Sequence, residues 1–254
     1  MAGRSGGVQR FAADYAAVPR DRRPLQLQTL AAAGQYRHAY ALAASYLAGD
    51  RDVLDWGCGN GHFARYLLTQ VHRVTGYSYD PPPAFVAGHA DFTFVPGVPD
   101  DPRGLPFADA SFDAACSIGV LEHVHELGGD QPDSLRELWR VLRPGGHLLI
   151  VHFPNAGSWI EATVRVANAW GITAKHQHSR MFWRGDLERL FGAGGWRVLA
   201  QARYNLIPRN VLRRLPSPLG DSPALCGALN AVDDVLGALL PSLAQNWYAV
   251  LQKA

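Results

Sequence analysis

The feature that most constrains the fold is the stretch "VLDWGCGNG", residues 53–61, which places three glycines within five positions. Ordering a glycine costs more chain entropy than ordering any other residue, so the cluster needs a structural reason. Residues 52–56 predict a short strand, and residues 62–70 predict a helix. A strand, a glycine turn and a helix in this order are typical of nucleotide sites, where backbone N–H groups face the ligand. A tight turn without a ligand is the alternative.

The spacing of the glycines indicates which kind of ligand the turn accepts. Gly57, Gly59 and Gly61 follow G-x-G-x-G, which is neither the G-x-G-x-x-G of dinucleotide enzymes nor the lysine-containing phosphate loop. Asp55 stands just before the glycines. Its negative charge would repel a phosphate, whereas its carboxylate oxygens could accept a hydrogen bond from an ammonium group. The turn therefore predicts a ligand with an amino-acid end and a nucleoside end.

Strands and helices alternate through residues 50–153, which predicts a parallel sheet with helices on both faces. Later strands of this part are expected at 73–79, 91–95, 112–118 and 147–153, and helices from about residue 120 and at 133–142. Strands at 197–204 and 246–254 bring the predicted total to seven. The expected fold class is α/β, with a doubly wound, mostly parallel seven-stranded sheet.

The remaining segments carry weaker patterns. Helices are expected at 31–49, 184–196 and 223–240, a loop at 205–223, an irregular segment at 154–182 and disorder at 1–10. We expect an N-terminal arm or partial cap over residues 1–35 and one large domain over residues 36–254.

Composition and charge narrow the classes of partner. The 254 residues carry a formal net charge of +2 with histidine neutral, which is no electrostatic footprint for nucleic acid or an anionic membrane. Cys58, Cys116 and Cys226 show neither metal-ligand spacing nor a disulfide framework. The first ten residues lack the apolar run of a signal peptide, and no stretch approaches the ~18 apolar residues of a membrane span. We expect a cytoplasmic protein without metal, nucleic-acid or membrane partners; the oligomeric state stays open.

Four segments, taken together, resemble one known family. They are "VLDWGCGNGHFARYL" (53–67), "LPFADASFDAACSIGVLEHV" (105–124), "ELWRVLRPGGHLLIVHFP" (137–154) and "RMFWRGDLERLFGAGGWRV" (180–198). In this order they resemble the class I S-adenosylmethionine-dependent methyltransferases, in particular their small-molecule, type-11-like branch. The resemblance covers roughly residues 36–204. It implies a Rossmann-like fold, S-adenosylmethionine as cofactor, S-adenosylhomocysteine as product and a small-molecule methyl acceptor.

The resemblance also implies where the two ends of the cofactor bind. Asp55 and the backbone of residues 57–59 would hold the methionine end, and residues 117–119 would lie beside the sulfonium. The acid that usually binds the ribose is replaced by Ser78, with Asp80 two residues later, so both are candidates. The full set of implied cofactor-binding residues is Asp55, Gly57, Cys58, Gly59, Ser78, Tyr79, Asp80, Val98, Pro99, Ser117, Ile118 and Gly119.

Adenine recognition departs from the usual pattern of the family. An acid commonly follows the third strand and binds the adenine amino group, but Val98 stands there, with Asp100 and Asp101 a little further on. The family also uses backbone groups at this point, so the departure leaves adenine binding possible.

A base is needed if the acceptor is a phenol or an alcohol, and histidine is the natural choice near neutral pH. The segment "LEHVHE" (121–126) follows the fourth strand and makes His123 the first candidate. His125, His152, His176 and His178 are the alternatives. A structural role for His123 is also open, because this segment is common in the family whatever the substrate. A metal site at Glu122, His125 and Glu126 is disfavoured, since nothing else at metal-ligand spacing supports it.

The acceptor itself is the least constrained part of the prediction. The resemblance places acceptor-pocket segments at about 154–182 and 205–245, where Trp159 and Trp170 would suit a flat apolar molecule. Oxygen is the favoured acceptor atom, with nitrogen or carbon as alternatives. A nucleic-acid methyltransferase is disfavoured, because "SIGV" stands where an Asn-Pro-Pro-aromatic run is common. Two other readings remain open: a non-methylating enzyme of the same fold, such as a cyclase or decarboxylase, and a non-catalytic cofactor-binding subunit.

Overall fold

The computed structural model describes residues 27–50, 52–98, 104–172 and 178–254, together with residues 15, 18, 19, 23 and 24. The expected disorder of residues 1–10 and the candidate site residues Pro99 and His176 lie outside the described part of the chain. Among the described helices, none is long and apolar enough to cross a membrane.

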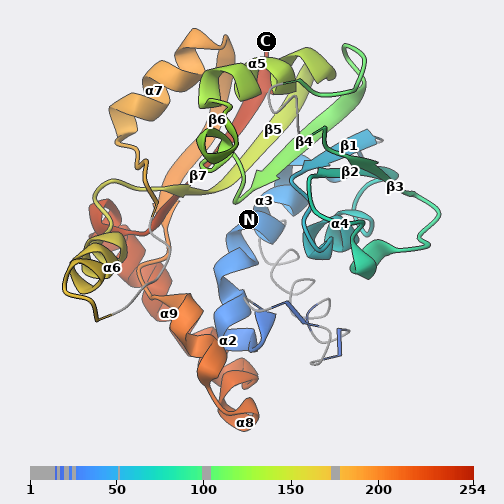
Figure 1. Ribbon diagram of the computed structural model, residues 1–254. Helices are drawn as coiled ribbons and strands as arrows, with labels where there is room; N and C mark the ends of the chain where they lie inside the picture. Colours follow the sequence, from blue (N-terminus) through green and yellow to red (C-terminus); the bar gives the residue numbers. More distant parts are fainter. Residues whose placement is uncertain are drawn as a thin grey trace. The chain divides into compact units, whose positions relative to one another are not determined.

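A seven-stranded sheet in the order β3-β2-β1-β4-β5-β7-β6 organises the fold (Figure 1). Its strands are β1 (Asp52–Trp56), β2 (Arg73–Ser78), β3 (Phe92–Pro96), β4 (Phe112–Ile118), β5 (Leu142–Pro154), β6 (Trp196–Tyr204) and β7 (Asn246–Lys253). The pairs β1–β2, β2–β3, β1–β4 and β4–β5 are parallel. This topology confirms the predicted doubly wound α/β class. The chain order reverses between β1 and β4, which is the switch point where such sheets bind ligands at their carboxyl ends.

Helices cover both faces of the sheet, as predicted. The α-helices are α2 (Leu30–Ala33), α3 (Arg37–Tyr46), α4 (His62–Leu67), α5 (Gln131–Val141), α6 (Trp159–Ala169), α7 (Arg184–Ala193), α8 (Ser217–Gly220) and α9 (Pro223–Leu239). The Asp55 carboxylate accepts the Ala64 N–H of α4, whereas Trp56 lines a cavity together with Glu137 of α5. Successive strand side chains point to opposite faces, so α4 and α5 lie on opposite sides of β1.

Several local predictions differ from the structure. The helix predicted from about residue 120 is instead the single 3-10 turn η5 (Val124–Leu127), which ends at Gly128 with φ +83°. The segment 154–182 contains α6, because the Ser158 side chain caps its first turn. The loop predicted at 205–223 contains η6 (Arg209–Arg214) and α8.

The predicted N-terminal helix at 31–49 is divided by the 3-10 turn η3 (Gly34–Tyr36) into α2 and α3. A Cβ at Gly34 would lie 3.0 Å from the Arg209 guanidinium, so a close approach of that side chain accompanies the break.

The chain divides into two compact units. The first unit comprises Met1–Ala41, Pro154–Trp183 and Ala202–Trp247, and the second comprises Leu42–Phe153, Arg184–Gln201 and Tyr248–Ala254. The buried core of the second unit is supplied by β1, β4 and β5 and by the inner face of α5, through residues such as Leu54, Ala115, Leu149, Leu135 and Leu138. Both segments predicted for acceptor binding, 154–182 and 205–245, belong to the first unit, and that role stays a prediction.

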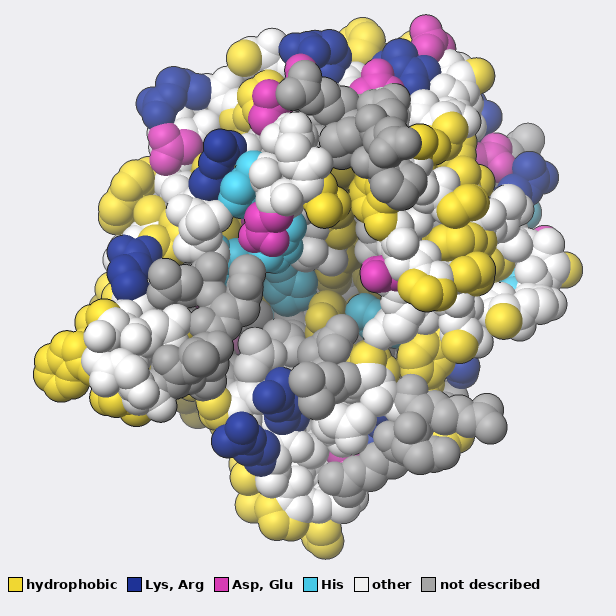
Figure 2. Space-filling model, viewed as in Figure 1, with side chains coloured by type: hydrophobic (Ala, Val, Ile, Leu, Met, Phe, Trp, Pro, Cys, Tyr) yellow, Lys and Arg dark blue, Asp and Glu magenta, His cyan; other side chains and the backbone are white. Residues whose placement is uncertain are grey.

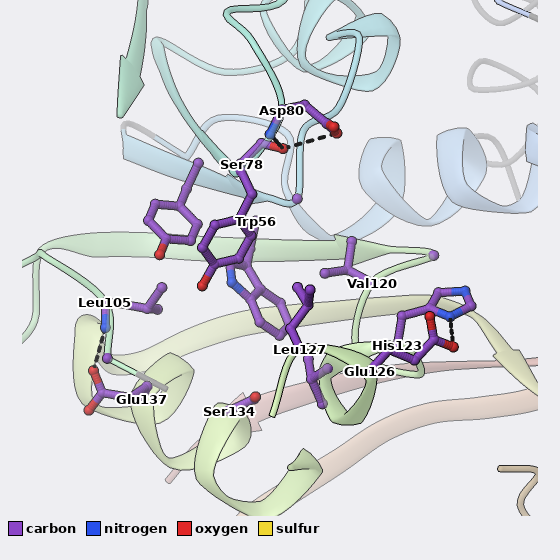
Figure 3. A pocket seen from close by; sticks show the side chains of 16 residues that line it. Trp56, Ser78, Asp80, Leu105, Val120, His123, Glu126, Leu127, Ser134 and Glu137 are labelled. Atoms are coloured by element: carbon purple, nitrogen blue, oxygen red, sulfur yellow. Dashed lines mark hydrogen bonds and ion pairs between the residues drawn. The ribbon is translucent and has the colours of Figure 1, made fainter. Parts of the chain in front are cut away.

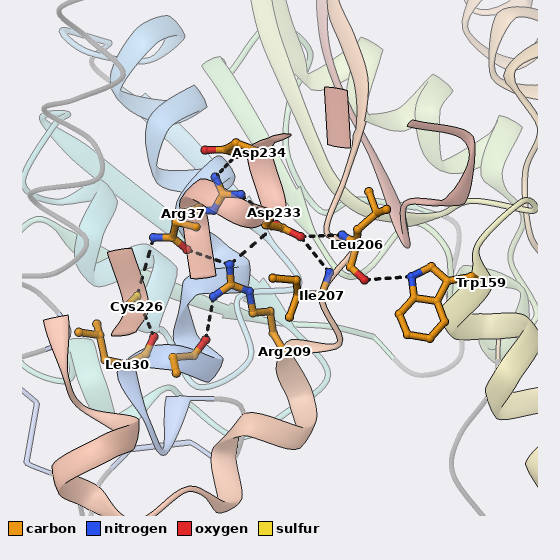
Figure 4. Close-up of polar contacts among 11 residues, drawn as sticks. Leu30, Arg37, Trp159, Leu206, Ile207, Arg209, Cys226, Asp233 and Asp234 are labelled. Carbon is orange, nitrogen blue, oxygen red and sulfur yellow. Dashed lines mark hydrogen bonds and ion pairs between the residues drawn. The ribbon is translucent and has the colours of Figure 1, made fainter. Parts of the chain in front are cut away.

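Buried charges tie the first unit together (Figure 4). Asp233 of α9 is 1% exposed and binds Arg37 at 2.9 Å. Its other carboxylate oxygen accepts the N–H groups of Leu206 and Ile207 at 2.8 and 2.9 Å. Arg209, also 1% exposed, lies 3.8 Å from the same carboxylate. Because a buried charge is costly unless it is paired and hydrogen-bonded, this network specifies how α9 packs on α3 and on the 205–209 segment.

The aromatic residues predicted for the acceptor pocket lie partly in solvent. Trp159 is 40% exposed, although its Nε1 donates to the Leu206 carbonyl at 3.0 Å. Val166, Trp170 and Ile172 extend an apolar surface along α6 and just beyond it (Figure 2). Trp170, at 78% exposed, is therefore not a core residue of the first unit.

Candidate active site

The three glycines of the first turn serve different purposes. The Gly57 and Cys58 N–H groups both donate to the Tyr77 carbonyl, at 2.7 and 3.2 Å, so these two groups already have protein partners. A Cβ at Gly57 would overlap the Val120 side chain. Gly61 has φ +81° and begins α4, where a Cβ would approach Pro83 at 2.7 Å.

Gly59 differs from Gly57 and Gly61 because no side chain of the described residues fills the space around it. Its φ is +48°, and in the part of the chain that the structure describes, a Cβ placed there would come within 4 Å of one atom, the Gly57 carbonyl oxygen at 4.0 Å. Packing between protein groups therefore accounts for Gly57 and Gly61, while the open side of Gly59 remains for a ligand.

Asp55 is a buried carboxylate with unused hydrogen-bonding capacity. It is 2% exposed, and one oxygen accepts the Ala64 N–H in the first turn of α4. Its Oδ2 has no hydrogen-bond partner among the described residues. Burial raises the pKa of Asp55 from 3.8 to about 7, and the Ala64 bond only partly offsets this. A buried anion of this kind would be stabilised by a cationic ligand group such as an ammonium.

At the end of β2, Ser78 holds the nearby acid Asp80 in position through two hydrogen bonds. Ser78 is buried, and its Oγ accepts the Asp80 N–H at 3.1 Å and donates to the Asp80 carboxylate at 3.3 Å. Asp80 itself is exposed. Ser78 thus orients the carboxylate of Asp80, which is the stronger hydrogen-bond acceptor of the two.

A cavity of about 530 Å³ lies at the carboxyl ends of β1, β2 and β4, within the second unit (Figure 3). Its volume falls in the range of small-molecule and cofactor sites. Figure 3 shows the Trp56 ring near the centre, with Ser78 and Asp80 on one side and Leu127, Ser134 and Glu137 on the other. The lining residues are Trp56, Gly57, Tyr77, Ser78, Tyr79, Asp80, Gly104, Leu105, Gly119, Val120, His123, Val124, Glu126, Leu127, Ser134 and Glu137.

The charged groups of this cavity favour a cationic or neutral ligand. Its lining contains Asp80, Glu126 and Glu137, and among the described lining residues none is Lys or Arg. Arg140 donates to Glu137 at 2.8 and 2.9 Å and holds the pKa of that carboxyl below its usual range. Glu137 in turn accepts the Leu105 N–H at 2.9 Å and fixes that part of the wall. Among the described lining residues a phosphate group would meet carboxylates and no Lys or Arg, whereas a sulfonium or ammonium group would be attracted by the carboxylates.

The candidate bases are distributed over both units. His123 lines the cavity, and its Nδ1 lies 2.9 Å from Glu126 Oε1. His125 is in the η5 turn and does not line the cavity. His152, in β5, has φ +71°, an uncommon conformation for a residue other than glycine. His178, in the first unit, lies 3.3 Å from Glu161.

The structure brings together only part of the predicted cofactor set. Gly57, Ser78, Tyr79, Asp80 and Gly119 line the cavity, whereas Asp55, Cys58, Gly59, Val98, Ser117 and Ile118 do not. Ser117 is buried and accepts the Leu121 N–H at 3.2 Å, so it shapes the turn after β4. The cofactor roles of all these residues stay predictions.

Sequence reasoning missed several lining residues, notably Trp56, Tyr77 and Glu137. Trp56 and Tyr77 are direct partners in the parallel β1–β2 pair, so their side chains share one face of the sheet. Strand alternation places Trp56 opposite Asp55, and that was the available signal. Glu137 had no such signal, because its position depends on how α5 packs.

Comparison with known proteins agrees with this geometry. The sequence model of a family described as "Methyltransferase domain" matches residues 28–201, which include the glycine turn and every residue that lines the cavity. The chain belongs to this methyltransferase family. A relative of the family is named as a probable S-adenosylmethionine-dependent methyltransferase, and a cofactor with a positive charge would accord with the acidic cavity.

Individual relatives of the methyltransferase cover parts of the chain. A probable S-adenosylmethionine-dependent methyltransferase of Mycolicibacterium smegmatis is 38% identical over 117 residues, 46% of this chain and 42% of that protein. A probable tRNA methyltransferase 9B of Homo sapiens is 36% identical over 98 residues, 39% of this chain and 20% of that protein. The matched regions thus span less than half of the length of these relatives.

One solved structure resembles nearly the whole methyltransferase. Burkholderia thailandensis 1,6-didemethyltoxoflavin-N1-methyltransferase, solved with 1,6-didemethyltoxoflavin and S-adenosylhomocysteine bound, has a TM-score of 0.58 at 20% sequence identity. The likeness covers 97% of this chain and 88% of that one, and it confirms the Rossmann-like fold.

Proposed function

We propose that this methyltransferase acts on a small molecule and that oxygen is the favoured acceptor atom. The observation that carries the proposal is the His123–Glu126 pair, which lies 2.9 Å apart in the wall of an otherwise acidic and apolar cavity. An imidazole next to a carboxylate is suited to take a proton from a hydroxyl group. Nitrogen and carbon acceptors are the alternatives.

Charge supports a small molecule over a nucleic acid. The lining residues include no Lys or Arg in the described part of the chain, and the net charge is only +2. Contacts to a phosphate backbone dominate nucleic-acid affinity and need cationic side chains. The relative named as a tRNA methyltransferase shares only 20% of its length with this chain, so its name supports a nucleic-acid substrate weakly. A cytoplasmic location remains part of the proposal.

The cofactor-binding residues divide by the part of the molecule that they would hold. Asp80, oriented by Ser78, would accept hydrogen bonds from the ribose hydroxyls. Asp55 and the open side of Gly59 would serve the charged methionine end. Tyr79 and Val98 would flank the adenine, and residues 117–119 would lie beside the sulfur. The cofactor supplies a methyl group already activated by the positive charge on its sulfur.

The protein's remaining task is alignment and proton removal. His123 would take the acceptor's proton, and Glu126 would orient the imidazole and stabilise its protonated form. The apolar groups of the cavity, such as Val120, Val124 and Leu127, would exclude water from the transfer.

The experiment is methyl transfer from tritium-labelled S-adenosylmethionine to three separate pools: hydroxylated aromatic compounds, small amines and total tRNA. We expect label in the hydroxylated pool and none in tRNA. Label confined to tRNA would overturn the small-molecule proposal, and label confined to the amines would overturn the choice of oxygen. His123→Ala protein serves as the control, because it should bind S-adenosylhomocysteine normally and transfer much less label.

A further inference from the structure

The helix α9, which lies wholly in the first unit, has one buried face and one exposed apolar face. Cys226 and Asp233 are two helical turns apart, and both are buried against other segments of this unit (Figure 4). On the face turned away from them, Val232, Val235 and Leu239 are 50, 59 and 71% exposed. Contiguous exposed apolar surface of this kind commonly marks an interaction site.

The exposed face is divided into a small half and a large half. In the first half of the helix the exposed side is formed by Ala224, Gly227, Ala228 and Ala231. A Cβ at Gly227 would meet no atom of the described residues within 4 Å, so the small half is open. In the second half the apolar exposed residues are Val232, Val235, Ala238 and Leu239. Small residues let a second helix approach closely, whereas large ones need a recess to enter.

Charge is nearly absent from the exposed face. Among the exposed residues of α9, Asp234 alone is charged, and it binds Arg37 at 2.7 Å. Depletion of charge is typical of the core of a protein interface. Helices that lie on membrane surfaces carry Lys and Arg on their polar side, but α9 contains neither and has two aspartates instead. The face therefore fits a protein better than an anionic lipid surface.

The area of the face is sufficient for a two-fold pair. Together with Leu240, which follows α9 and is 46% exposed, the face presents on the order of 500 Å² of apolar surface. An isologous pair covers the same face on both copies. It would therefore bury about 1,000 Å² in total, which is what a specific interface needs.

We propose that α9 pairs with α9 of a second copy of this chain, in antiparallel orientation about a two-fold axis. In this orientation the small half of each helix faces the large half of the other. Val235 and Leu239 of one copy then enter the space that the alanines and Gly227 leave open on the other. A parallel pair would set large residues against large ones and leave a gap at the opposite end, which close packing disfavours.

Sedimentation equilibrium of the full chain at micromolar concentrations tests the pairing. We expect a dimer for the wild type. Val235→Asp should raise the dissociation constant by about 100-fold or more, because the new charge would be buried without a partner. Ala228→Phe fills the small half without adding charge and should raise the dissociation constant by about 10-fold. Val166→Asp is the matched control and should change nothing, because Val166 is 54% exposed on another helix of the same unit.

Cysteine crosslinking tests the orientation. The native cysteines are buried, so a cysteine introduced on the exposed face is the accessible one. Ala231→Cys, near the middle of the helix, should form a disulfide-linked dimer on oxidation with copper phenanthroline. Ala224→Cys and Leu239→Cys should each fail alone, because an antiparallel pair separates like ends by about 20 Å along the helix axis. A mixture of these two proteins should crosslink.

Thermal unfolding of every variant checks that it is folded, and Ala228→Phe with the crosslinks decides if Val235→Asp is not. A wild type that stays monomeric at high micromolar concentration would overturn the inference, as would a dimer that folded Val235→Asp and Ala228→Phe leave intact. Ala224→Cys that crosslinks with itself, and not with Leu239→Cys, would contradict the antiparallel orientation. A monomer that floats with phosphatidylglycerol vesicles would assign the face to lipid instead.

Discussion

Ser78 Oγ accepts the backbone N–H of Asp80 at 3.1 Å and donates to the Asp80 carboxylate at 3.3 Å. This relationship assigns different tasks to two residues that the sequence offers as equal candidates for the ribose. We expect Asp80→Ala to weaken S-adenosylhomocysteine binding by about 1–3 kcal/mol, the scale of hydrogen bonds to a charged group. Ser78→Ala should cost less, since the carboxylate remains and only its orientation is loosened. Calorimetric titration of both variants measures the difference, and the reverse order would assign the ribose to Ser78.

Substitutions at Gly57 and Gly59 should affect different properties of the protein, stability in the first case and cofactor binding in the second. Gly57→Ala should destabilise the protein, because the new methyl group would overlap Val120 at a backbone φ of +77°. Gly59→Val should abolish cofactor binding, because its side chain would fill the space that the described residues leave open beside Gly59. Its φ of +48° adds a strain of about 1–2 kcal/mol, so the variant should still fold. Thermal unfolding and S-adenosylhomocysteine titration separate the two effects; normal affinity in Gly59→Val would remove the ligand from this turn.

Asp55 predicts a pH dependence whose sign follows from its burial. Its pKa is about 7 in the folded protein and 3.8 ordinarily, so between these values the folded state holds a proton that the unfolded chain has released. The Asp55 contribution to stability therefore falls as pH rises through this window, by several kcal/mol at most. Asp55→Asn, which can still accept the Ala64 N–H, should remove this part of the slope. Urea unfolding at a series of pH values from 4 to 8, about one unit beyond the upper pKa, measures it.

Cofactor binding should respond to Asp55 in the opposite sense. An ammonium group favours the ionised carboxylate, so wild-type affinity for S-adenosylhomocysteine should rise as pH approaches 7. In Asp55→Asn the affinity should be lower and nearly independent of pH. An unchanged pH profile in the variant would show that Asp55 only fixes α4 to β1.

The sequence was most informative where the cause of a structure is local. The glycine turn, the order of strands and helices, and the apolar face of α5 are all set by neighbouring residues, and each was predicted. The apolar pattern predicts that α5 begins at residue 133, but the helix begins at Gln131, because Asp130 caps it by accepting the Asp133 N–H at 2.7 Å. That capping signal was present in the sequence.

The rest depends on contacts between distant segments. The sequence predicts Trp56 as a strand residue. That its side chain lines a cavity depends on how α5 packs against the sheet, which the sequence pattern does not indicate. The residues of "LEHVHE" favour a helix, yet the chain forms only the short η5 turn there. Gly128 and Gly129 follow directly, and the Gly129 N–H donates to the Val124 carbonyl at 3.0 Å. Glu161 and His178 are 17 positions apart, and no spacing rule joins them.

The first unit should depend strongly on Asp233. This carboxylate binds Arg37 and two backbone N–H groups while 1% exposed. Asp233→Ala would leave those groups and Arg209 without their anion, so we expect a loss of about 3–5 kcal/mol in the free energy of unfolding. Asp234→Ala is the matched control, because Asp234 also binds Arg37 but is 58% exposed. Urea unfolding of both variants measures the contrast, and equal losses would contradict the importance of burial.

The last prediction concerns His123. Its Nδ1 lies 2.9 Å from Glu126 in the wall of the cavity. If it takes the acceptor's proton, His123→Ala should lower kcat by roughly 10²–10⁴, the usual reach of general acid–base catalysis, while S-adenosylhomocysteine affinity barely moves. His123→Gln keeps much of the size but not the basicity, so it should be nearly as slow. Glu126→Gln should cause a smaller loss, since it removes only the orienting charge.

Single-turnover rates across pH decide between this role and a structural one for His123. The His123 N–H donates to the Val120 carbonyl at 2.9 Å, so the residue also shapes the turn after β4. If shaping the turn is its only task, both His123 variants should lose stability and keep their rate once folded. A His123→Gln enzyme with the wild-type rate and pH profile would move the base to His125, His152, His176 or His178, or to no residue. The last outcome is the one expected for an acceptor that arrives already ionised, because alignment and exclusion of water then suffice for transfer.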